Sequence, residues 1–443
     1  MNPSNQTCSK PASFETVSAT SHARETCCKE YATLRRRDLL GGALTSAVTF
    51  MGAPILLPRV ALARGGSPRD VLISIYLRGG MDGLTTCVPY TDSELYVKRP
   101  TLAVPPPGQT NGALDLDGDF GLAPACAPLL TPWANGHLAI VHATGSTDPS
   151  RSHFDAQKFM ESATPNMGTT NITTGWLGRF LSLATPVGAG DLRGMSLGSV
   201  LPRTLVGAPA TLPVPDPASF TFPGNAMTAP ARRAAISDMY ALTQEPMSSA
   251  ATSSLAAIDL LELVDFENYV PAYGAVYENL AFANGLKSIA TMLKSGVALE
   301  AAHLDFQGWD LHSAMGPITG TLADMLGELT RALEAFYKDM TDTIDSIVIV
   351  VKSEFGRRIA ENGSAGTDHG HGNCMFAIGG HIAGGQVLRD WPGLANSGNG
   401  DLSITIDYRD ILAEILAVRM GATSRMLDEI FPNHVRTTYG ITA

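Results

Sequence analysis

Residues 346–373 read SIVIVVKSEFGRRIAENGSAGTDHGHGN, an apolar run followed by a polar, glycine-rich loop. The run IVIVV at 347–351 is entirely β-branched, as a strand covered by helices on both faces requires. Such strands belong to parallel α/β sheets, which bind ligands outside the carboxyl ends of their strands. The polar side chains that follow this predicted strand are Ser353, Glu354, Arg357, Asp368, His369 and His371.

The segment TDHGHG at 367–372 suits a metal site, because Gly370 and Gly372 let the backbone turn tightly around whatever the imidazoles hold. A polar surface turn with incidental histidines is the alternative interpretation. The preceding strand and the SEFGR segment favour the metal.

A first strand is predicted at 71–77, within VLISIYLRGGMDGL. Asp82 follows this strand and is flanked by glycines, so it is placed to bind a cation. It could equally cap the helix that follows. Farther on, Asp115, Asp117 and Asp119 alternate as in calcium loops, but the downstream glutamate of such loops is missing, and we assign a turn.

The next clear strand, HLAIVHA at 137–143, leads into the polar segment TDPSRSHFD at 147–155. This segment enters a predicted helix whose free amides suit an anion. The alternative is a capping box formed by Ser152 and Asp155.

Asp310 and His312 lie two residues apart in FQGWDLHSAMG at 306–316, ahead of a long amphipathic helix predicted at 322–340. On an extended segment both side chains point to one side, so they can chelate one cation. A last strand is predicted near Ile404, and Asp407 and Asp410 are expected to cap the closing helix.

The predicted fold class is α/β, a three-layer α/β/α sandwich with a mostly parallel central sheet. Residues 214–296 are rich in Ala, Met, Leu and Ser with helical spacing, which predicts a helical insertion or cap. The formal net charge of −11 and the lack of a Lys/Arg cluster after residue 63 exclude nucleic acid as the expected partner.

Residues 1–63 are expected to be an export signal with a long N-terminal arm. Arg35, Arg36 and Arg37 precede an apolar run that reaches Leu57, which resembles a twin-arginine signal, and the ALA triplet at 61–63 supplies a cleavage site. A retained membrane anchor is the alternative. The domain at 64–443 would then pass through the twin-arginine export machinery to the periplasm or the exterior. It retains three of the six cysteines, Cys87, Cys126 and Cys374, which excludes a disulfide framework.

Five motifs in this order resemble an exported bacterial family catalogued as domain of unknown function 1501: RGGMDGL, SRSHFDAQKFMES, GWDLHS, SEFGRRIAENGSAGTDHGHGN and TIDYRD. The resemblance runs from about residue 70 to the C-terminus, and it implies that an exported partner protein is conceivable. That family is in turn similar to the alkaline phosphatase and sulfatase superfamily, which implies an alkaline phosphatase-like fold with metals at the carboxyl edge of the sheet.

Within that superfamily pattern, Asp82 matches the first-strand metal Asp and His369 or His371 the late histidine. Asp310 and His312 match the middle pair, although their spacing is shorter than usual. Glu354-Phe355 stands where the superfamily normally has an Asp-His pair, so a second metal would lose an imidazole ligand.

The same pattern offers two nucleophiles. TDPSR resembles the sulfatase pattern C-x-P-x-R with Thr147 in the nucleophile position, whereas Ser152 sits at the helix start where a phosphatase serine would be. Arg151 or Arg357 could hold the oxygens of a tetrahedral anion.

The sequence therefore predicts an exported metal-dependent hydrolase of small phosphate or sulfate esters, with one or two ions of zinc, manganese, iron or magnesium. The alternatives are a non-catalytic envelope binding protein that keeps the fold and a structural metal, and a metal-dependent isomerase or mutase. The expected metal ligands come from Asp82, Asp310, His312, Glu354, Asp368, His369 and His371.

Overall fold

The computed structural model describes residues 70–166, 172–188, 190–245, 247–395 and 400–443. The predicted export signal at 1–63 lies outside these ranges. Within them, no helix combines the length and the apolar character that crossing a bilayer demands.

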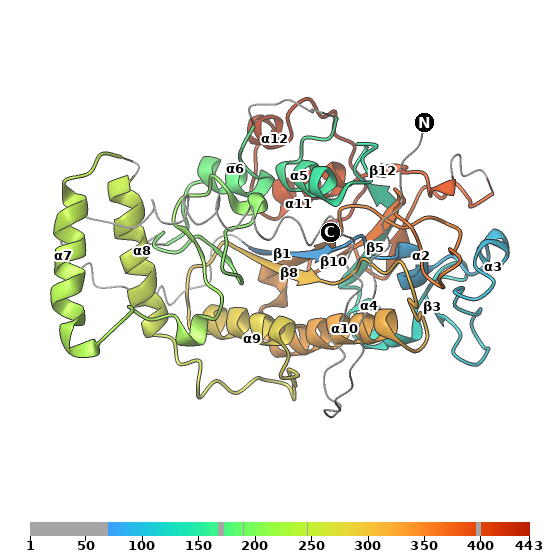
Figure 1. Cartoon of the computed structure of the whole chain (residues 1–443), viewed down its shortest axis with the longest axis horizontal. Helices are drawn as coiled ribbons and strands as arrows, with labels where there is room; N and C mark the ends of the chain where they lie inside the picture. Colours follow the sequence, from blue (N-terminus) through green and yellow to red (C-terminus); the bar gives the residue numbers. More distant parts are fainter. Residues whose placement is uncertain (1–69, 167–171, 189, 246, 396–399) are drawn as a thin grey trace, which may run out of the picture.

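A nine-stranded sheet runs through the centre of the molecule in the order β11-β5-β10-β9-β1-β8-β6-β7, with β12 paired to β5 (Figure 1). Among its described strands only β10 runs antiparallel to its neighbours, which confirms the mostly parallel sheet. The strands are β1 (Val71–Arg78), β5 (Leu138–Gly145), β6 (Gly194–Ser196), β7 (Thr211–Pro213), β8 (Ala301–Gln307), β9 (Ile347–Lys352), β10 (Asn373–Ile378), β11 (Gln386–Leu388) and β12 (Ile406–Asp407). A small second sheet is formed by β2 (Cys87–Val88), β3 (Leu114–Asp115) and β4 (Gly121–Leu122).

Helices cover both faces of the sheet and complete the predicted α/β/α sandwich (Figure 1). One face carries α9 and α10, and the other carries α5, α6, α11 and α12. The α-helices are α2 (Gly83–Thr86), α3 (Glu94–Lys98), α4 (Leu130–Ala134), α5 (His153–Ser162), α6 (Trp176–Leu183), α7 (Ala229–Ala241), α8 (Met247–Glu262), α9 (Ala281–Lys294), α10 (Thr321–Asp339), α11 (Tyr408–Val418) and α12 (Ser424–Ile430). The 3-10 helices are η1 (Pro124–Leu129), η2 (Arg203–Leu205), η3 (Pro217–Ser219), η4 (Ala226–Thr228) and η5 (Thr341–Ser346).

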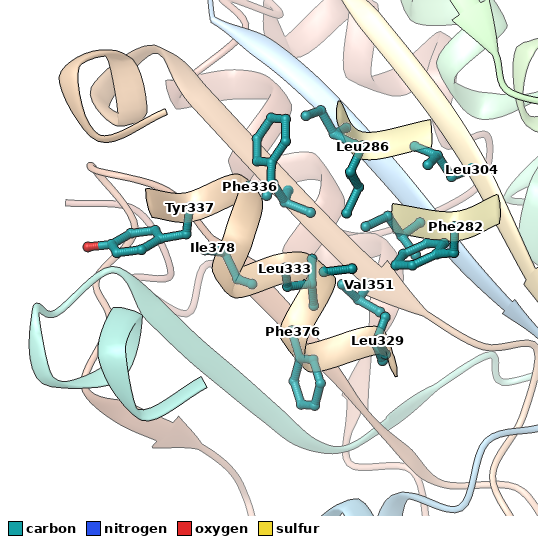
Figure 2. Close-up of a cluster of buried hydrophobic side chains, with 14 of the residues drawn as sticks. Phe282, Leu286, Leu304, Leu329, Leu333, Phe336, Tyr337, Val351, Phe376 and Ile378 are labelled. Carbon is teal, nitrogen blue, oxygen red and sulfur yellow. The ribbon is translucent and has the colours of Figure 1, made fainter. Parts of the chain in front are cut away.

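The β-branched run of β9 fills both cores, because successive strand residues point to opposite faces. Ile349 and Val351 join the core under α9 and α10, whereas Val348 and Val350 join the opposite core. Figure 2 shows how α10 supplies Leu329, Leu333 and Phe336 to the first of these cores, opposite Val351 on β9. Each such buried side chain contributes about 1.5–3 kcal/mol relative to its exposed state.

The predicted helical segment at 214–296 contains α7, α8 and α9, but these helices have different positions. The pair α7 and α8 projects from one end of the molecule and is tied together by an ion pair between Arg233 and Asp259 (Figure 1). In contrast, α9 is part of the layer beneath the sheet. The strand β8 was not predicted from the sequence, because Asp305, which pairs with Arg78 of β1, interrupts the apolar pattern.

Two aspartates of the predicted turn at 115–119, Asp117 and Asp119, pair with Arg389, so an arginine supplies positive charge at this turn. The three cysteines Cys87, Cys126 and Cys374 are buried free thiols, consistent with the exclusion of a disulfide framework.

Lys352, the last residue of β9, is a buried cation. Its side chain is only 2% exposed, no described residue accepts a hydrogen bond from its ammonium group, and that group lies 4.3 Å from the centre of the Tyr76 ring. Burial lowers the pKa of Lys352 from 10.5 to about 8. The charged form is therefore unfavourable in the folded state.

We expect Lys352→Met to stabilise the protein at pH 7. The unfolded chain binds more protons than the folded one between pH 8 and the unfolded pKa of about 10.4, so the stability of the wild type should rise with pH across that window. The methionine variant should lose this dependence and gain about 1–3 kcal/mol at pH 7, since lost cation–π attraction offsets part of the relief. Denaturant unfolding at pH 7 and 10 measures this, with Lys158→Met on α5 as a half-buried control expected to change little. A destabilised Lys352→Met would contradict it.

Candidate metal centre

Three imidazoles and one carboxylate meet beyond the carboxyl edge of the sheet. His153 is the first residue of α5, which follows β5, and His369 lies in the loop before β10. Asp310 and His312 follow β8, and the side chains of His153 and Asp310 are buried. Four ligand-type residues from three separate segments of the chain are thus brought to one place.

The Nε2 atom of His369 is at the centre of this group. It lies 3.0 Å from Nε2 of His153, 2.9 Å from Nε2 of His312 and 3.1 Å from Oδ1 of Asp310. Asp310 Oδ1 also lies 3.0 Å from Nε2 of His312 and 3.5 Å from Nε2 of His153. Because each ring nitrogen carries either one proton or one lone pair, these five contacts cannot all be hydrogen bonds. Atoms that converge in this way are arranged as ligands around a cation, and the ligand atoms of His153, Asp310 and His369 lie within 4.8 Å of one another.

The opposite nitrogen of each imidazole has its own partner. Nδ1 of His153 lies 2.7 Å from Glu354, Nδ1 of His312 lies 3.1 Å from Asp368, and Nδ1 of His369 lies 2.9 Å from the backbone oxygen of Arg151. A carbonyl oxygen only accepts, so His369 must carry its proton on Nδ1, and ionised carboxylates favour the same tautomer in the other two rings. In the neutral form of each ring, this tautomer places the lone pair on Nε2 and directs it at the centre, which is the arrangement of metal-ligating histidines.

Asp310 is held in place by Arg357. The Nη2 atom of this buried arginine donates to Asp310 Oδ1 over 2.8 Å, whereas the buried Oδ2 atom has no hydrogen-bond partner among the described residues. Burial by itself would raise the pKa of Asp310, but contacts with the three imidazoles and the charge of Arg357 hold that pKa well below its usual range. The carboxylate is therefore ionised, with one oxygen still available to a cation.

The electrostatic environment favours positive charge within the cluster. Burial opposes protonation of His153, yet its contacts with Asp310 and Glu354 outweigh burial and raise the pKa of His153 to about 9. A cation placed between these groups would meet the same attraction.

A short ladder of backbone hydrogen bonds fixes His369. Gly356 N donates to His371 O over 2.8 Å, Arg358 N to Asp368 O over 2.9 Å, and Gly370 N to Gly356 O over 2.9 Å. These bonds join the SEFGR segment to the DHGH segment, so the two parts of the stretch at 346–373 form one unit. Gly370 and Gly372 were expected to allow a tight turn, but here they allow close packing instead, Gly370 against the backbone of Arg357 and Gly372 against Leu402.

Two of the predicted ligands lie outside the cluster. Asp82 caps α2 through Thr85 N and pairs with Arg99 at 2.8 Å, so the capping interpretation of this residue is the correct one. His371 places its Nε2 atom 3.1 Å from the backbone oxygen of Pro149, without a described contact to the other imidazoles. Glu354 and Asp368 reach the cluster only from outside, where they orient His153 and His312.

The predicted catalytic side chains are mostly engaged elsewhere. The Thr147 hydroxyl accepts from Asn166 over 3.2 Å, and Arg151 pairs with Asp401. Arg357 donates to the backbone oxygens of four residues in addition to Asp310, which leaves it little capacity to hold an anion; these are Gly79, Gly80, Trp309 and Thr367. Ser152 is the N-cap residue of α5, but its side chain makes no capping hydrogen bond, so the predicted capping box is wrong.

His153 is the ligand-type residue that the sequence analysis missed. The segment SRSHFD was interpreted as an anion site or a cap. The available signal was positional, because this segment follows a buried strand just as the segments that carry Asp310 and His369 do.

The fold and the cluster define an α/β sandwich protein with a candidate metal centre at the carboxyl edge of its sheet. The chain belongs to the family described as "Protein of unknown function (DUF1501)", whose model matches residues 69–431. This confirms the family that the motifs indicated. No curated protein matches the chain.

Several solved structures resemble the chain. One is the PsFucS1 sulfatase from Pseudoalteromonas sp., with 13% identity, a TM-score of 0.39, and coverage of 85% of this chain and 72% of that one. Another is the C-terminal periplasmic domain of EcEptC from Escherichia coli in a complex with Zn, with 11% identity, a TM-score of 0.31, and coverage of 72% and 74%. Alkaline phosphatase from the Antarctic bacterium TAB5 has 8% identity, a TM-score of 0.27, and coverage of 70% and 92%.

Proposed function

We propose that the chain is an exported metal-dependent hydrolase of phosphate or sulfate esters that holds a divalent ion through His153, Asp310, His312 and His369. The observation that carries the proposal is the convergence of three Nε2 atoms on one carboxylate, with every Nδ1 atom held from outside. Three imidazoles and a carboxylate suit zinc, manganese or iron, whereas magnesium prefers an all-oxygen set.

The cluster is open to solvent on one side, as a substrate requires. The His312 side chain is 34% exposed and that of Asp368 is 56% exposed, whereas His153 and Glu354 form the buried wall. When bound, a divalent ion supplies a Lewis acid that polarises an ester oxygen. Ser152 adjoins His153 in the chain and is the nucleophile candidate that remains closest to the cluster in sequence.

A non-catalytic metal-binding protein is the second candidate, and a specific observation favours it. Arg151 is paired with Asp401, Arg357 is saturated by backbone oxygens and Asp310, and Thr147 is bonded to Asn166. The cluster thus has ligands for a cation, but both predicted anion-binding arginines already hold a carboxylate, since Arg151 pairs with Asp401 and Arg357 pairs with Asp310.

Turnover of model esters separates the two candidates. The full chain is purified without chelator, its metal content is measured by elemental analysis, and p-nitrophenyl phosphate and sulfate are tested with zinc, manganese or iron. For a hydrolase we expect Asp310→Asn to lose metal and activity together, and Ser152→Ala to lose activity but keep the metal. A stoichiometric metal without turnover of either ester would favour the non-catalytic protein, and a folded chain that takes up none of the three metals would overturn both candidates.

Glu354→Gln is expected to weaken metal binding by about 10–100-fold without unfolding the protein. The buried carboxylate accepts from the Gly79 backbone N and the Gln157 amide as well as contacting His153, so the isosteric amide keeps the shape but loses the charge that orients the imidazole. Competition with a metal indicator measures the affinity. Asp155→Asn is the control, because it removes a carboxylate charge at an exposed position of α5, the helix that begins with His153. It should leave the metal affinity unchanged.

A further inference from the structure

A pocket of about 510 Å³ lies between α9, the carboxyl end of β8 and the segment around η3. Its volume is in the range of small-molecule sites, about 300–1,000 Å³. None of the four cluster residues lines it, so it is a separate site. Leu197, directly after β6, and Leu304 on β8 place it at the edge of the sheet where α/β proteins bind ligands.

One wall of the pocket is a polar stripe on α9. Asn284, Lys287, Ser288 and Thr291 all line it, and their spacing of three and four residues puts them on one face of the helix. The Thr291 hydroxyl donates a hydrogen bond to the backbone oxygen of Lys287 in the same helix. No described residue pairs with the Lys287 ammonium or the Ser288 hydroxyl, so this wall presents both donors and acceptors to the pocket.

The floor of the pocket carries an ionised carboxylate. Asp305 Oδ1 accepts from Arg78 Nε over 2.7 Å and lies 3.0 Å from His303 Nε2, while no described residue donates to its Oδ2. Burial would raise the pKa of Asp305, but Arg78 and His303 hold that pKa well below its usual range. Asp305 is an exposed residue and its side chain is 30% exposed, so a ligand in the pocket can contact this carboxylate.

Apolar side chains complete the lining. Phe266 and Phe282 contribute to it, and Phe282 is stacked on Phe306 with ring centres 4.9 Å apart, which fixes its position. Figure 2 shows Phe282 beside Leu304, at the edge of the core under the sheet. The pocket therefore combines apolar surfaces with a few hydrogen-bonding groups in fixed places, as ligand sites do.

We propose that this pocket binds an uncharged, hydroxyl-rich ring compound, that is, a neutral sugar. Hydroxyl groups can donate to Asp305 and accept from Lys287 or Asn284, while the carbon face of a ring packs against phenylalanine. Arg78 neutralises Asp305, and the opposite charges of Asp216 and Lys287 balance each other, so a neutral ligand fits the lining best. The proposal does not depend on the metal centre.

Calorimetric titration of the full chain with glucose, galactose, maltose and trehalose tests the proposal. We expect at least one of these sugars to bind with a Kd on the order of 1 mM or tighter. The double variant Asn284→Ala/Lys287→Ala should weaken that binding by about tenfold or more, and alanine at these α9 positions is compatible with the helix. Ser288→Leu, which fills the pocket, should have a similar effect.

Two control variants test whether a loss of sugar binding is specific to substitutions in this pocket. Ser182→Leu makes the same exchange on an exposed face of α6 and should leave sugar binding unchanged, as should His369→Ala, which disrupts the metal cluster. The proposal is overturned if none of the four sugars binds, if acetate or methylamine binds in their place, or if both pocket variants bind sugar as the wild type does.

Discussion

Replacing His153 by alanine is expected to weaken metal binding by more than about 100-fold, whereas replacing His371 leaves the metal bound. Loss of an orienting partner of a ligand typically costs 10–100-fold in affinity, and loss of a ligand should cost more. Nε2 of His153 lies 3.0 Å from that of His369, so it faces the cluster. Nε2 of His371 instead contacts the Pro149 backbone oxygen at 3.1 Å.

The two histidine variants distinguish between the ligands assigned from the structure and those suggested by the DHGH motif alone, because the motif would favour the opposite result. Elemental analysis of the wild type, His153→Ala and His371→Ala, each checked for native circular dichroism, gives the metal content per chain. His153→Ala leaves Glu354 buried without the imidazole, so His153→Gln should be measured as a second variant that keeps a polar partner there. Metal retained in both His153 variants, or lost in His371→Ala, would show that the cluster has been assigned to the wrong residues.

The parts of the site that could be predicted are those that depend only on residues close together in the sequence. An apolar run of this length predicts a buried strand from its own residues alone, which is why β1, β5 and the β-branched β9 were predicted. The side chains of Asp310 and His312 were expected to point the same way on an extended segment, and Nε2 of His312 lies 3.0 Å from Oδ1 of Asp310. The strands also place the polar loops at one edge of the sheet.

What could not be predicted depends on partners far away in the chain. Asp82 is neutralised by Arg99 and bonded by Thr367, and neither residue is signalled by the RGGMDGL motif. Similarly, the motif does not say which histidine of DHGH turns inward. Both histidines contact backbone oxygens at 149–151, His369 through Nδ1 and His371 through Nε2. Only His369 therefore keeps its Nε2 atom for the cluster.

Gly370→Ala is expected to destabilise the protein by about 3 kcal/mol or more and to reduce metal binding with it. A Cβ atom at this position would lie 2.4 Å from the carbonyl carbon of Arg357 and 2.7 Å from Arg358 N, and these are backbone atoms that cannot rotate away. The clash would open the ladder between 356–358 and 368–371, which places His369 in the cluster and Arg357 against Asp310.

Gly363→Ala is the matched control, because it makes the same exchange in the same loop. No atom lies within 4 Å of a Cβ added at Gly363, and its backbone is not in the left-handed region. The alanine should therefore leave metal binding intact and leave stability unchanged or raised by about 0.4–1 kcal/mol, because it restricts the unfolded chain. Denaturant unfolding and elemental analysis of both variants measure the difference. If Gly370→Ala unfolds at the same denaturant concentration as Gly363→Ala, the close contact of the two segments cannot be what holds His369 in place, and the cluster must be organised by the 149–153 segment instead.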